Sequence, residues 1–313
     1  MSSEKRPRKK KNSSLGTILL IAIMVLGVGI MAYPSISDYW NQIHQSRAIS
    51  SYVRAVEQMD DSQYEALWES AQAYNRELAA HPLGWELTEE ELNRYKKVLD
   101  ISGTGIMGYI DIPKINVELP IYHGSEETVL QIAIGHIASS SLPVGGETSH
   151  TLLTGHRGLP SARLFTDLDK MALGDVFYIR VLGEVLAYQV DDIHVVLPSD
   201  LSTLGLTPGE DYVTLITCTP YGVNTHRLLV RGRRIGFDSD QPEAAVRITS
   251  DAIRISPRLA VPAVAIPILF IALVISLLVT GKHGKNKHKH KANQMQGGRH
   301  ESTEENESME DEA

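Results

Sequence analysis

The chain is poor in cysteine, with a single thiol, Cys218, in 313 residues. A lone cysteine cannot pair within its own chain, which excludes an internal disulfide framework. The sequence also contains no glycine-rich phosphate loop, no clustered metal-ligand spacing and no internal repeat, so it implies no nucleotide, metal or other cofactor. Three interpretations of the thiol stay open: an inert buried side chain, an intermolecular disulfide, or a reactive nucleophile.

Charged residues are missing from two long apolar runs. The first covers residues 15–33 and the second residues 259–279, which are 19 and 21 residues without a charge. Because about 20 apolar residues cross a bilayer as a helix, we predict transmembrane helices at 15–33 and 259–280. The alternatives are a cleaved signal peptide for the first run and a buried core helix for the second. However, "MAYPSIS" is a poor cleavage site, and a charged stretch directly follows the second run.

Basic residues flank the two runs. "EKRPRKKK" (4–11) precedes the first, and "KHGKNKHKHK" (282–291) follows the second. Lys and Arg beside membrane spans stay cytoplasmic, so we predict a two-pass plasma-membrane protein with both termini in the cytoplasm. Residues 34–258 would then lie outside the cell, and the basic flanks would contact anionic membrane lipid.

Acidic residues dominate the rest of the chain. Residues 15–280 hold 18 of the 30 basic and 30 of the 38 acidic side chains, a net charge of −12, which argues against nucleic acid as a partner. The predicted organisation, in chain order, is a basic cytoplasmic N-terminus (1–14), a transmembrane helix (15–33), an extracellular helical region (34–104), a β-rich catalytic domain (105–237), a juxtamembrane linker (238–258), a transmembrane helix (259–280) and a charged cytoplasmic tail (281–313).

The extracellular region begins with helical patterns. An apolar stripe at near-helical spacing runs through "DSQYEALWESAQAYNREL" and consists of Tyr64, Leu67, Trp68, Ala71, Tyr74 and Leu78. We predict capping boxes formed by Ser62 with Glu65 and by Thr88 with Glu91, at the starts of two helices. Between these helices, "HPLGWEL" (81–87) contains helix breakers.

From residue 105 onward, short runs rich in β-branched residues alternate with Gly, Pro and Asn turns. This spacing predicts a mainly-β domain, either a sandwich or a barrel. We expect one short helix inside it, near "SARLFTDLDKM" (161–171).

Cys218 ends the run "TLITC", a predicted strand that a broad hairpin loop follows. Side chains alternate on the returning strand, so only one of His226 and Arg227 can lie beside the thiol. With a pKa of about 8.5, only roughly 3% of a free thiol is ionised at pH 7, and a nucleophile therefore needs a nearby base. His156 in "TLLTGHRG" is a candidate base, whereas its neighbour Arg157 is expected to be solvated.

These motifs match a known family. The sequence closely resembles the sortases, the cysteine transpeptidases of Gram-positive cell surfaces. "TLITC" fits their TLxTC motif with the nucleophile at Cys218, and the family's histidine and arginine fall on His156 and Arg227. The segments "SLPVGGETSHTLLTGHRGLP" and "CTPYGVNTHRLLVRG", together with two membrane spans, look like class C, the pilus-assembling subgroup.

The resemblance implies an eight-stranded β-barrel that is preceded by helices. Cys218 would attack the Thr–Gly carbonyl of an LPxTG-like sorting signal to form a thioacyl-enzyme, and His156 would protonate the departing fragment. A lysine amine of a pilin subunit would resolve the acyl-enzyme, while Arg227 would steady the substrate or its oxyanion. No metal or cofactor is implied.

Class C members usually carry a lid in which an Asp-Pro-aromatic motif covers the active site. The corresponding residues here are His81, Pro82, Leu83, Gly84 and Trp85. The proline is present and the aspartate is not, so a charge-assisted bond to Arg227 is missing. We therefore expect a readily opening flap at 81–87, with Trp85 as its plug and Leu83 as the second choice.

Three alternatives stay open for the function. A sortase could use the amine of a cell-wall peptide cross-bridge in place of a pilin lysine. A cysteine protease would only hydrolyse its substrate, although no papain-like "CGSCW" surrounds Cys218. A non-enzymatic membrane scaffold would keep the thiol for structure alone.

Overall fold

The computed structural model describes residues 13–81 and 86–236. The predicted linker, second transmembrane span and charged tail all lie outside these residues. Described residues from Gly29 onward group into one compact unit, and the preceding part of the first helix belongs to a second unit.

The first helix, α1 (Ser13–Glu57), contains the first predicted span. Its segment Ile21–Glu57 is long and apolar enough to cross a membrane, and it is the one such helix in the described part of the chain. The helix does not stop at residue 33, where the predicted span ends, but continues through Pro34. The two-pass arrangement stays a prediction.

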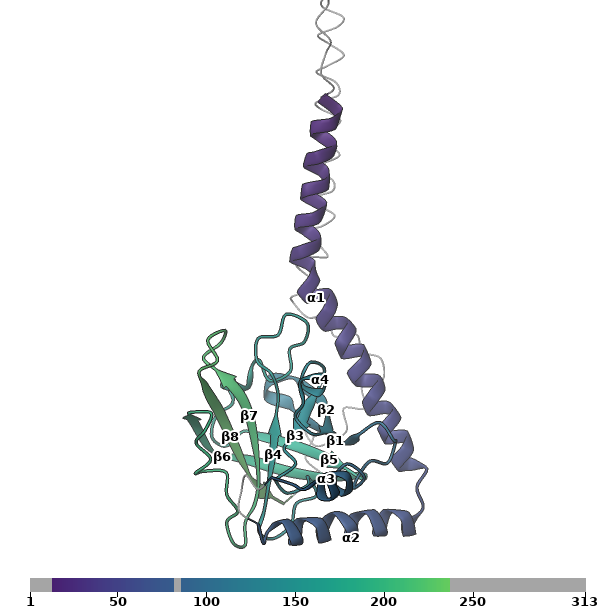
Figure 1. Ribbon diagram of the computed structural model, residues 1–313, viewed down its shortest axis with the longest axis vertical. Helices are drawn as coiled ribbons and strands as arrows, with labels where there is room; N and C mark the ends of the chain where they lie inside the picture. The colour runs from purple at the N-terminus through teal and green to yellow at the C-terminus, as the bar shows by residue number, and fades with distance from the viewer. Residues whose placement is uncertain (1–12, 82–85, 237–313) are drawn as a thin grey trace, which may run out of the picture. The chain divides into compact units, whose positions relative to one another are not determined.

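The β-rich region closes into a barrel with the strand order β1-β2-β3-β4-β7-β8-β6-β5 (Figure 1). Its strands are β1 (Ile106–Ile112), β2 (Val117–His123), β3 (Ile134–His136), β4 (Ser149–Thr154), β5 (Val176–Val181), β6 (Glu184–Val196), β7 (Asp211–Thr219) and β8 (His226–Ile235). The pairs β2–β3 and β4–β7 are parallel, and the other neighbours are antiparallel. The eight-stranded barrel is confirmed, and the sandwich alternative is wrong.

The two faces of β7 have different surroundings. Val213 and Leu215 face the barrel interior and belong to its main apolar core. Because side chains alternate along a strand, Ile216 lies on the outer face, where a second apolar cluster forms from Leu152, Leu204, Ile216 and Leu229. Cys218 follows Ile216 on this outer face, so the thiol is not an interior residue.

The helices after α1 begin at capping boxes. α2 (Asp61–Leu78) is capped by Asp60 with Gln63, so the predicted box of Ser62 with Glu65 is wrong. The reason is that a carboxylate is the stronger acceptor: Asp60 Oδ1 accepts both the Gln63 N–H, at 2.8 Å, and the Ser62 hydroxyl, at 2.6 Å. The box of Thr88 with Glu91 at the start of α3 (Glu89–Tyr95) is confirmed.

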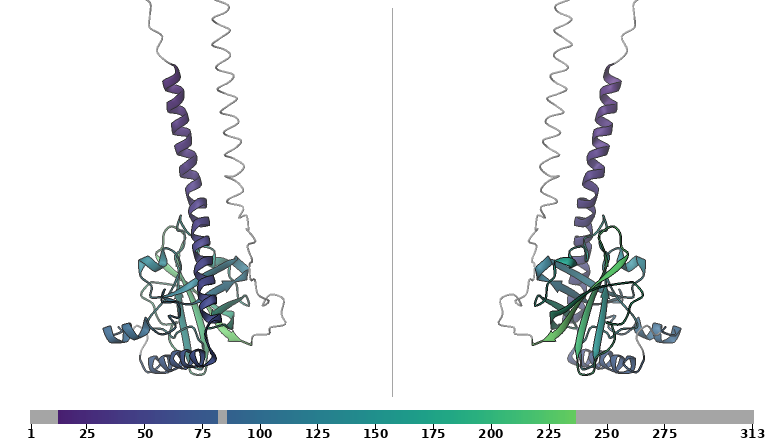
Figure 2. Two further views of the ribbon diagram at one scale, coloured as in Figure 1. Left: turned by 90° about the vertical axis from the view of Figure 1, so that its right-hand side faces the viewer. Right: turned by 90° about the vertical axis from the view of Figure 1, so that its left-hand side faces the viewer.

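The apolar stripe of α2 packs against the barrel core, as the sequence predicts. Ala71 and Tyr74 are buried in the main cluster, and Tyr64, Leu67, Trp68 and Leu78 pack against it. In two orientations α2 lies across one end of the barrel (Figures 1 and 2).

The helical region is also bonded to the barrel through tyrosine hydroxyls. Tyr52 of α1 donates to Met107 O at 3.1 Å and accepts the Leu182 N–H at 2.8 Å. Tyr95 of α3 accepts the Gly124 N–H at 2.9 Å and lies 2.9 Å from Nδ1 of His136.

The prediction of one short helix within the β region is too low, because the structure has three short helical turns among the residues it describes there. A 3₁₀ turn, η2 (Leu168–Lys170), lies in the predicted stretch. Two others occur elsewhere, namely η1 (Pro113–Ile115) and α4 (Glu127–Leu130). Sequence periodicity cannot detect helices of one turn, because they are shorter than the repeat that it measures.

Candidate active site

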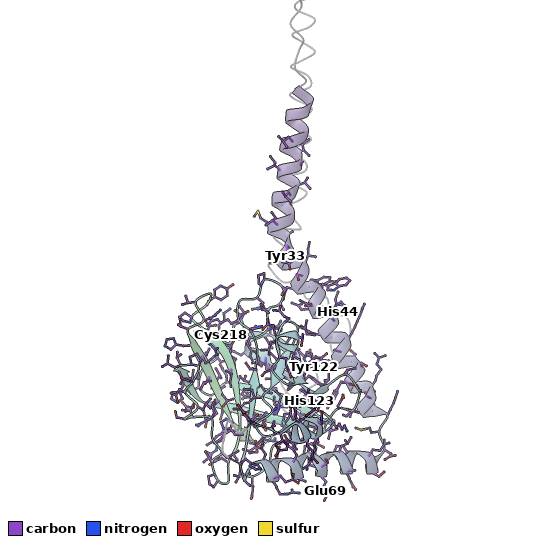
Figure 3. All side chains as sticks on the ribbon, viewed as in Figure 1. Tyr33, His44, Glu69, Tyr122, His123 and Cys218 are labelled. Carbon is purple, nitrogen blue, oxygen red and sulfur yellow. The ribbon has the colours of Figure 1, made fainter. Side chains whose placement is uncertain are left out.

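The thiol lies at the end of β7, beside the hairpin that leads into β8. Cys218 is half-buried and unpaired. Its direct cross-strand partner is Arg227, while His226 lies opposite Thr219. The register therefore decides between the two basic residues that the sequence left open, and it pairs Cys218 with Arg227. Figure 3 shows Cys218 at the opposite end of the barrel from Glu69 of α2.

The parallel pairing of β4 with β7 brings His156 to the same end. Thr154 is paired with Ile216, and the Gly155 N–H donates to Ile216 O at 3.1 Å. The Thr217 hydroxyl donates to Gly155 O at 2.7 Å. Continuing this register by two residues, from Thr154 and Ile216, carries His156 to the level of Cys218.

A glycine is required immediately before the histidine. A Cβ at Gly155 would lie 2.6 Å from Ile134 Cδ1 and 2.9 Å from Phe165 Cδ2. The Phe165 N–H also donates to His156 O at 3.2 Å. The loop carrying His156 is therefore pressed against β3 and bonded to its own returning segment.

A carboxylate faces the histidine ring. Nε2 of His156 lies 3.3 Å from both carboxylate oxygens of Glu127, which α4 presents. The pKa of Glu127 is lowered, first by the amide of Gln131 and then by the charge and hydrogen bond of His156. Sequence reasoning missed Glu127, because no motif links it to the thiol. Its contact leaves Nδ1 as the ring nitrogen that Glu127 does not engage.

The guanidinium of Arg227 bonds to backbone carbonyls of the β7–β8 hairpin and keeps other donors available. Nη1 of Arg227 donates to Asn224 O at 3.3 Å and to His226 O at 3.2 Å, both within the hairpin. A guanidinium has five N–H donors, so the others can serve a substrate carbonyl or an oxyanion.

Arg157 was expected to be solvated, but its side chain is buried. Its side chain is 9% exposed and pairs with Asp169 at 2.5 Å. The expectation is wrong because burial depends on how the loop folds, which places Asp169 of the same loop and the hydroxyl of the sequence-distant Thr219 around the guanidinium.

The structure describes only part of the predicted lid (81–87). His81 is exposed and lies just after α2. Leu83 and Trp85 lie outside the described residues, so the plug stays a prediction.

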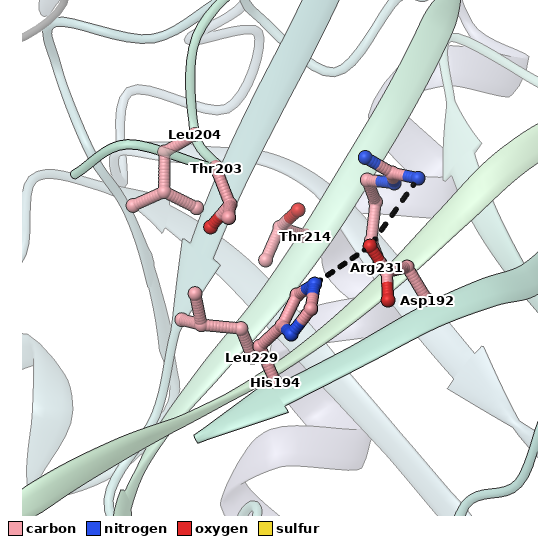
Figure 4. Close-up of a pocket in the computed structure, with 7 residues that line it drawn as sticks. All are labelled: Asp192, His194, Thr203, Leu204, Thr214, Leu229 and Arg231. Atoms are coloured by element: carbon pink, nitrogen blue, oxygen red, sulfur yellow. Dashed lines mark hydrogen bonds and ion pairs between the residues drawn. The ribbon is translucent and has the colours of Figure 1, made fainter. Parts of the chain in front are cut away.

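A small cavity lies farther along the outer face of β7 and β8 (Figure 4). It is lined by Asp192, His194, Thr203, Leu204, Thr214, Leu229 and Arg231. His194 bonds to Asp192 at 2.8 Å, and the Thr203 hydroxyl is buried without a partner in the described part of the chain. The cavity volume of about 10 Å³ has room for one water molecule. No group of three or more potential metal ligands occurs among residues 13–81 and 86–236.

Comparisons with known proteins agree with this geometry. Residues 110–235 match the family model described as the Sortase domain. Sortase A of Streptococcus agalactiae serotype III (strain NEM316) is 31% identical over 117 residues, which are 36% of this chain and 47% of that protein. The match thus spans about half the length of that relative.

Solved structures match more fully. Sortase C1 from Streptococcus agalactiae is 52% identical with a TM-score of 0.60, over 61% of this chain and 100% of that one. Sortase C of Streptococcus pneumoniae, whose structure is described as informing catalysis and pilin substrate specificity, is 45% identical with a TM-score of 0.54. That match covers 61% of this chain and 97% of the other.

Proposed function

Because the chain belongs to the sortase family, in its class C, we propose that it is a membrane-anchored cysteine transpeptidase that joins LPxTG-like sorting signals to amines. The observation that carries this proposal is that the strand pairings bring three residues to the same end of the barrel. Cys218 ends β7, Arg227 pairs with it from β8, and the loop after β4 supplies His156.

In the proposed reaction, His156 takes the proton of the Cys218 thiol, and the sulfur attacks the carbonyl carbon between Thr and Gly of the sorting signal. The tetrahedral oxyanion is stabilised by free N–H donors of Arg227. The C–N bond then breaks, a thioester forms, and His156 gives the departing amine its proton. An incoming amine attacks the thioester, loses a proton to His156 and releases the thiolate.

We propose a pilin lysine as the acceptor amine. Support comes from the likeness to sortase C structures, one of which is described in terms of pilin specificity. A cell-wall cross-bridge amine is the second candidate acceptor. The proposed location is the outer face of the plasma membrane, with α1 as anchor and 259–280 as a second span.

The test uses the full chain in detergent micelles with an LPxTG peptide. Two acceptors compete, a lysine-bearing pilin peptide and a cross-bridge peptide, and mass spectrometry identifies the product. We expect an isopeptide to the lysine.

Cys218→Ala should give no product and His156→Ala almost none, and Arg227→Ala should lower the rate by about 10²–10³. Arg233→Ala, an exposed position on β8 paired with Glu210, is the control and should match wild type. Joining by Cys218→Ala would refute the proposal, and a cross-bridge product would move the function to the second candidate.

A further inference from the structure

We propose that Arg157 is a positioning residue that holds the His156 loop against the strand end carrying Cys218. This inference rests on the proposed function, because it concerns how those two groups are kept in register. Nothing in the "TLITC" or "TLLTGHRG" motifs indicates this role, since arginine beside a loop histidine is ordinarily a solvated residue.

The contacts of Arg157 join the neighbours of the two reacting residues. Its Nη1 donates to the hydroxyl of Thr219 at 3.2 Å. Arg157 directly follows His156, and Thr219 directly follows Cys218. This hydrogen bond therefore bridges the β4 loop and the end of β7 one residue beyond each reacting side chain.

The other end of the guanidinium is tied down. Nη2 donates to Oδ2 of Asp169 at 2.5 Å, and Asp169 lies in the η2 turn within the same loop. One planar group thus connects three segments: the residue after the histidine, the η2 turn of its loop, and the strand end of the thiol. A lysine ammonium is a single point charge and cannot reproduce this fork.

An aromatic ring covers the guanidinium from the β7–β8 hairpin. The ring centroid of Tyr221 lies 5.9 Å from Cζ of Arg157. Gly158 has a φ of +78°, and a Cβ there would lie 3.0 Å from Tyr221 Cε2. The glycine after Arg157 therefore lets the loop turn closely beneath the ring. In "HRG", a proposed catalytic histidine is followed by the positioning arginine and by the glycine whose turn places that arginine against Tyr221.

One N–H donor of the Arg157 guanidinium is buried without a hydrogen-bond partner among the described residues, which costs free energy on folding. This donor is Nε of Arg157. The carboxylate partner of the guanidinium, Asp169, is 45% exposed, and an ion pair open to solvent adds little to stability. Retaining an arginine with an unpaired donor here fits a role in geometry better than a role in stability.

The test compares steady-state kinetics of the full chain in detergent micelles, with the LPxTG and lysine peptides as substrates. Arg157→Met should lower kcat by about 10²-fold with little change in KM, the effect expected when a reacting group shifts by about 1 Å. Arg157→Lys should recover part of the loss. Thr219→Val, which keeps the shape and removes the hydroxyl acceptor, should lower kcat roughly tenfold. The matched control is Arg163→Met in the same loop, because Lys170 still pairs with its partner Asp167 at 2.9 Å. This control should keep wild-type kinetics.

A second readout separates positioning from stability. Cys218 is the only thiol, so its alkylation by iodoacetamide reports on one site. We expect Arg157→Met and Thr219→Val to change the pH profile of alkylation toward that of His156→Ala, while thermal unfolding shows both variants folded at the assay temperature. Wild-type kcat and wild-type alkylation profiles in these variants would overturn the proposal. So would a loss of activity that only follows the unfolded fraction. If the wild-type protein itself fails to join peptides, the proposed function is wrong. The alkylation profiles still test whether Arg157 positions the His156 loop.

Discussion

Acid should weaken the fold through one buried histidine. His136 at the end of β3 is fully buried, with Nδ1 at 2.9 Å from the Tyr95 hydroxyl and Nε2 at 2.8 Å from Ser141 O. A neutral ring fits these contacts, because Nε2–H donates to the Ser141 carbonyl and leaves Nδ1 as an acceptor facing the phenol, whose hydroxyl also donates to His136 O at 3.1 Å. Burial lowers the pKa of His136 from 6.5 to about 4, and the nearby His123 acts in the same direction.

The sign follows from proton counting. Between pH 6.5 and pH 4 the unfolded chain holds a proton on this histidine and the folded chain does not, so the free energy of unfolding falls as pH falls. The contribution is fully present above pH 6.5 and is lost progressively down to about pH 4. At about 1.4 kcal/mol per pH unit, the loss amounts to about 3 kcal/mol, a large share of a typical domain's stability.

Urea unfolding of the full chain in detergent, followed by circular dichroism from pH 7.5 to pH 4, measures this effect. His136→Gln is the comparison, because an amide can still donate to Ser141 O and does not titrate. Wild type should lose about 3 kcal/mol more than the variant over this range. His150 also has a pKa lowered by burial and adds a fall of the same sign, but it is present in both proteins. Parallel pH profiles for the two proteins would refute the reasoning.

Two further predictions concern the parts that the structure does not describe. Protease added to intact protoplasts should destroy the segment 34–258 and spare an epitope in the tail, because basic flanks keep both termini cytoplasmic; an externally accessible tail at 290–313 would overturn the two-pass arrangement. Trp85→Ala should speed alkylation of Cys218 with little change in the unfolding temperature, because a plug shields the thiol without supporting the core. An unchanged alkylation rate with a large stability loss would assign Trp85 to packing.

Local patterns predicted much of the fold. The apolar stripe of α2 and the box at Thr88 depend on residues within a few positions of each other, and both are confirmed. The same reasoning left a sandwich and a barrel open, because closure depends on pairings such as β1 with β5 between distant segments. The resemblance to a family, rather than periodicity, pointed to the barrel.

The site divides in the same way. Alternation along a hairpin reduced the partner of Cys218 to two residues, and the register of β7 with β8 selected Arg227. Glu127 and the burial of Arg157 were missed. Each depends on a contact between loops that no sequence pattern encodes: α4 reaches His156, and η2 reaches Arg157.

The contacts that sequence reasoning missed all hold the loop that carries His156, and there is a physical reason for this. Cys218 and Arg227 stand on adjacent strands, so the ladder between β7 and β8 holds them in place. His156 follows the end of β4, and strand pairing holds only the residues before it. If His156 is the base that we propose, it must lie within hydrogen-bond reach of the group it serves, so this loop needs further restraint. The Phe165 bond to its carbonyl, the Glu127 contact to its ring and the Arg157 bridge to β7 supply that restraint from three directions.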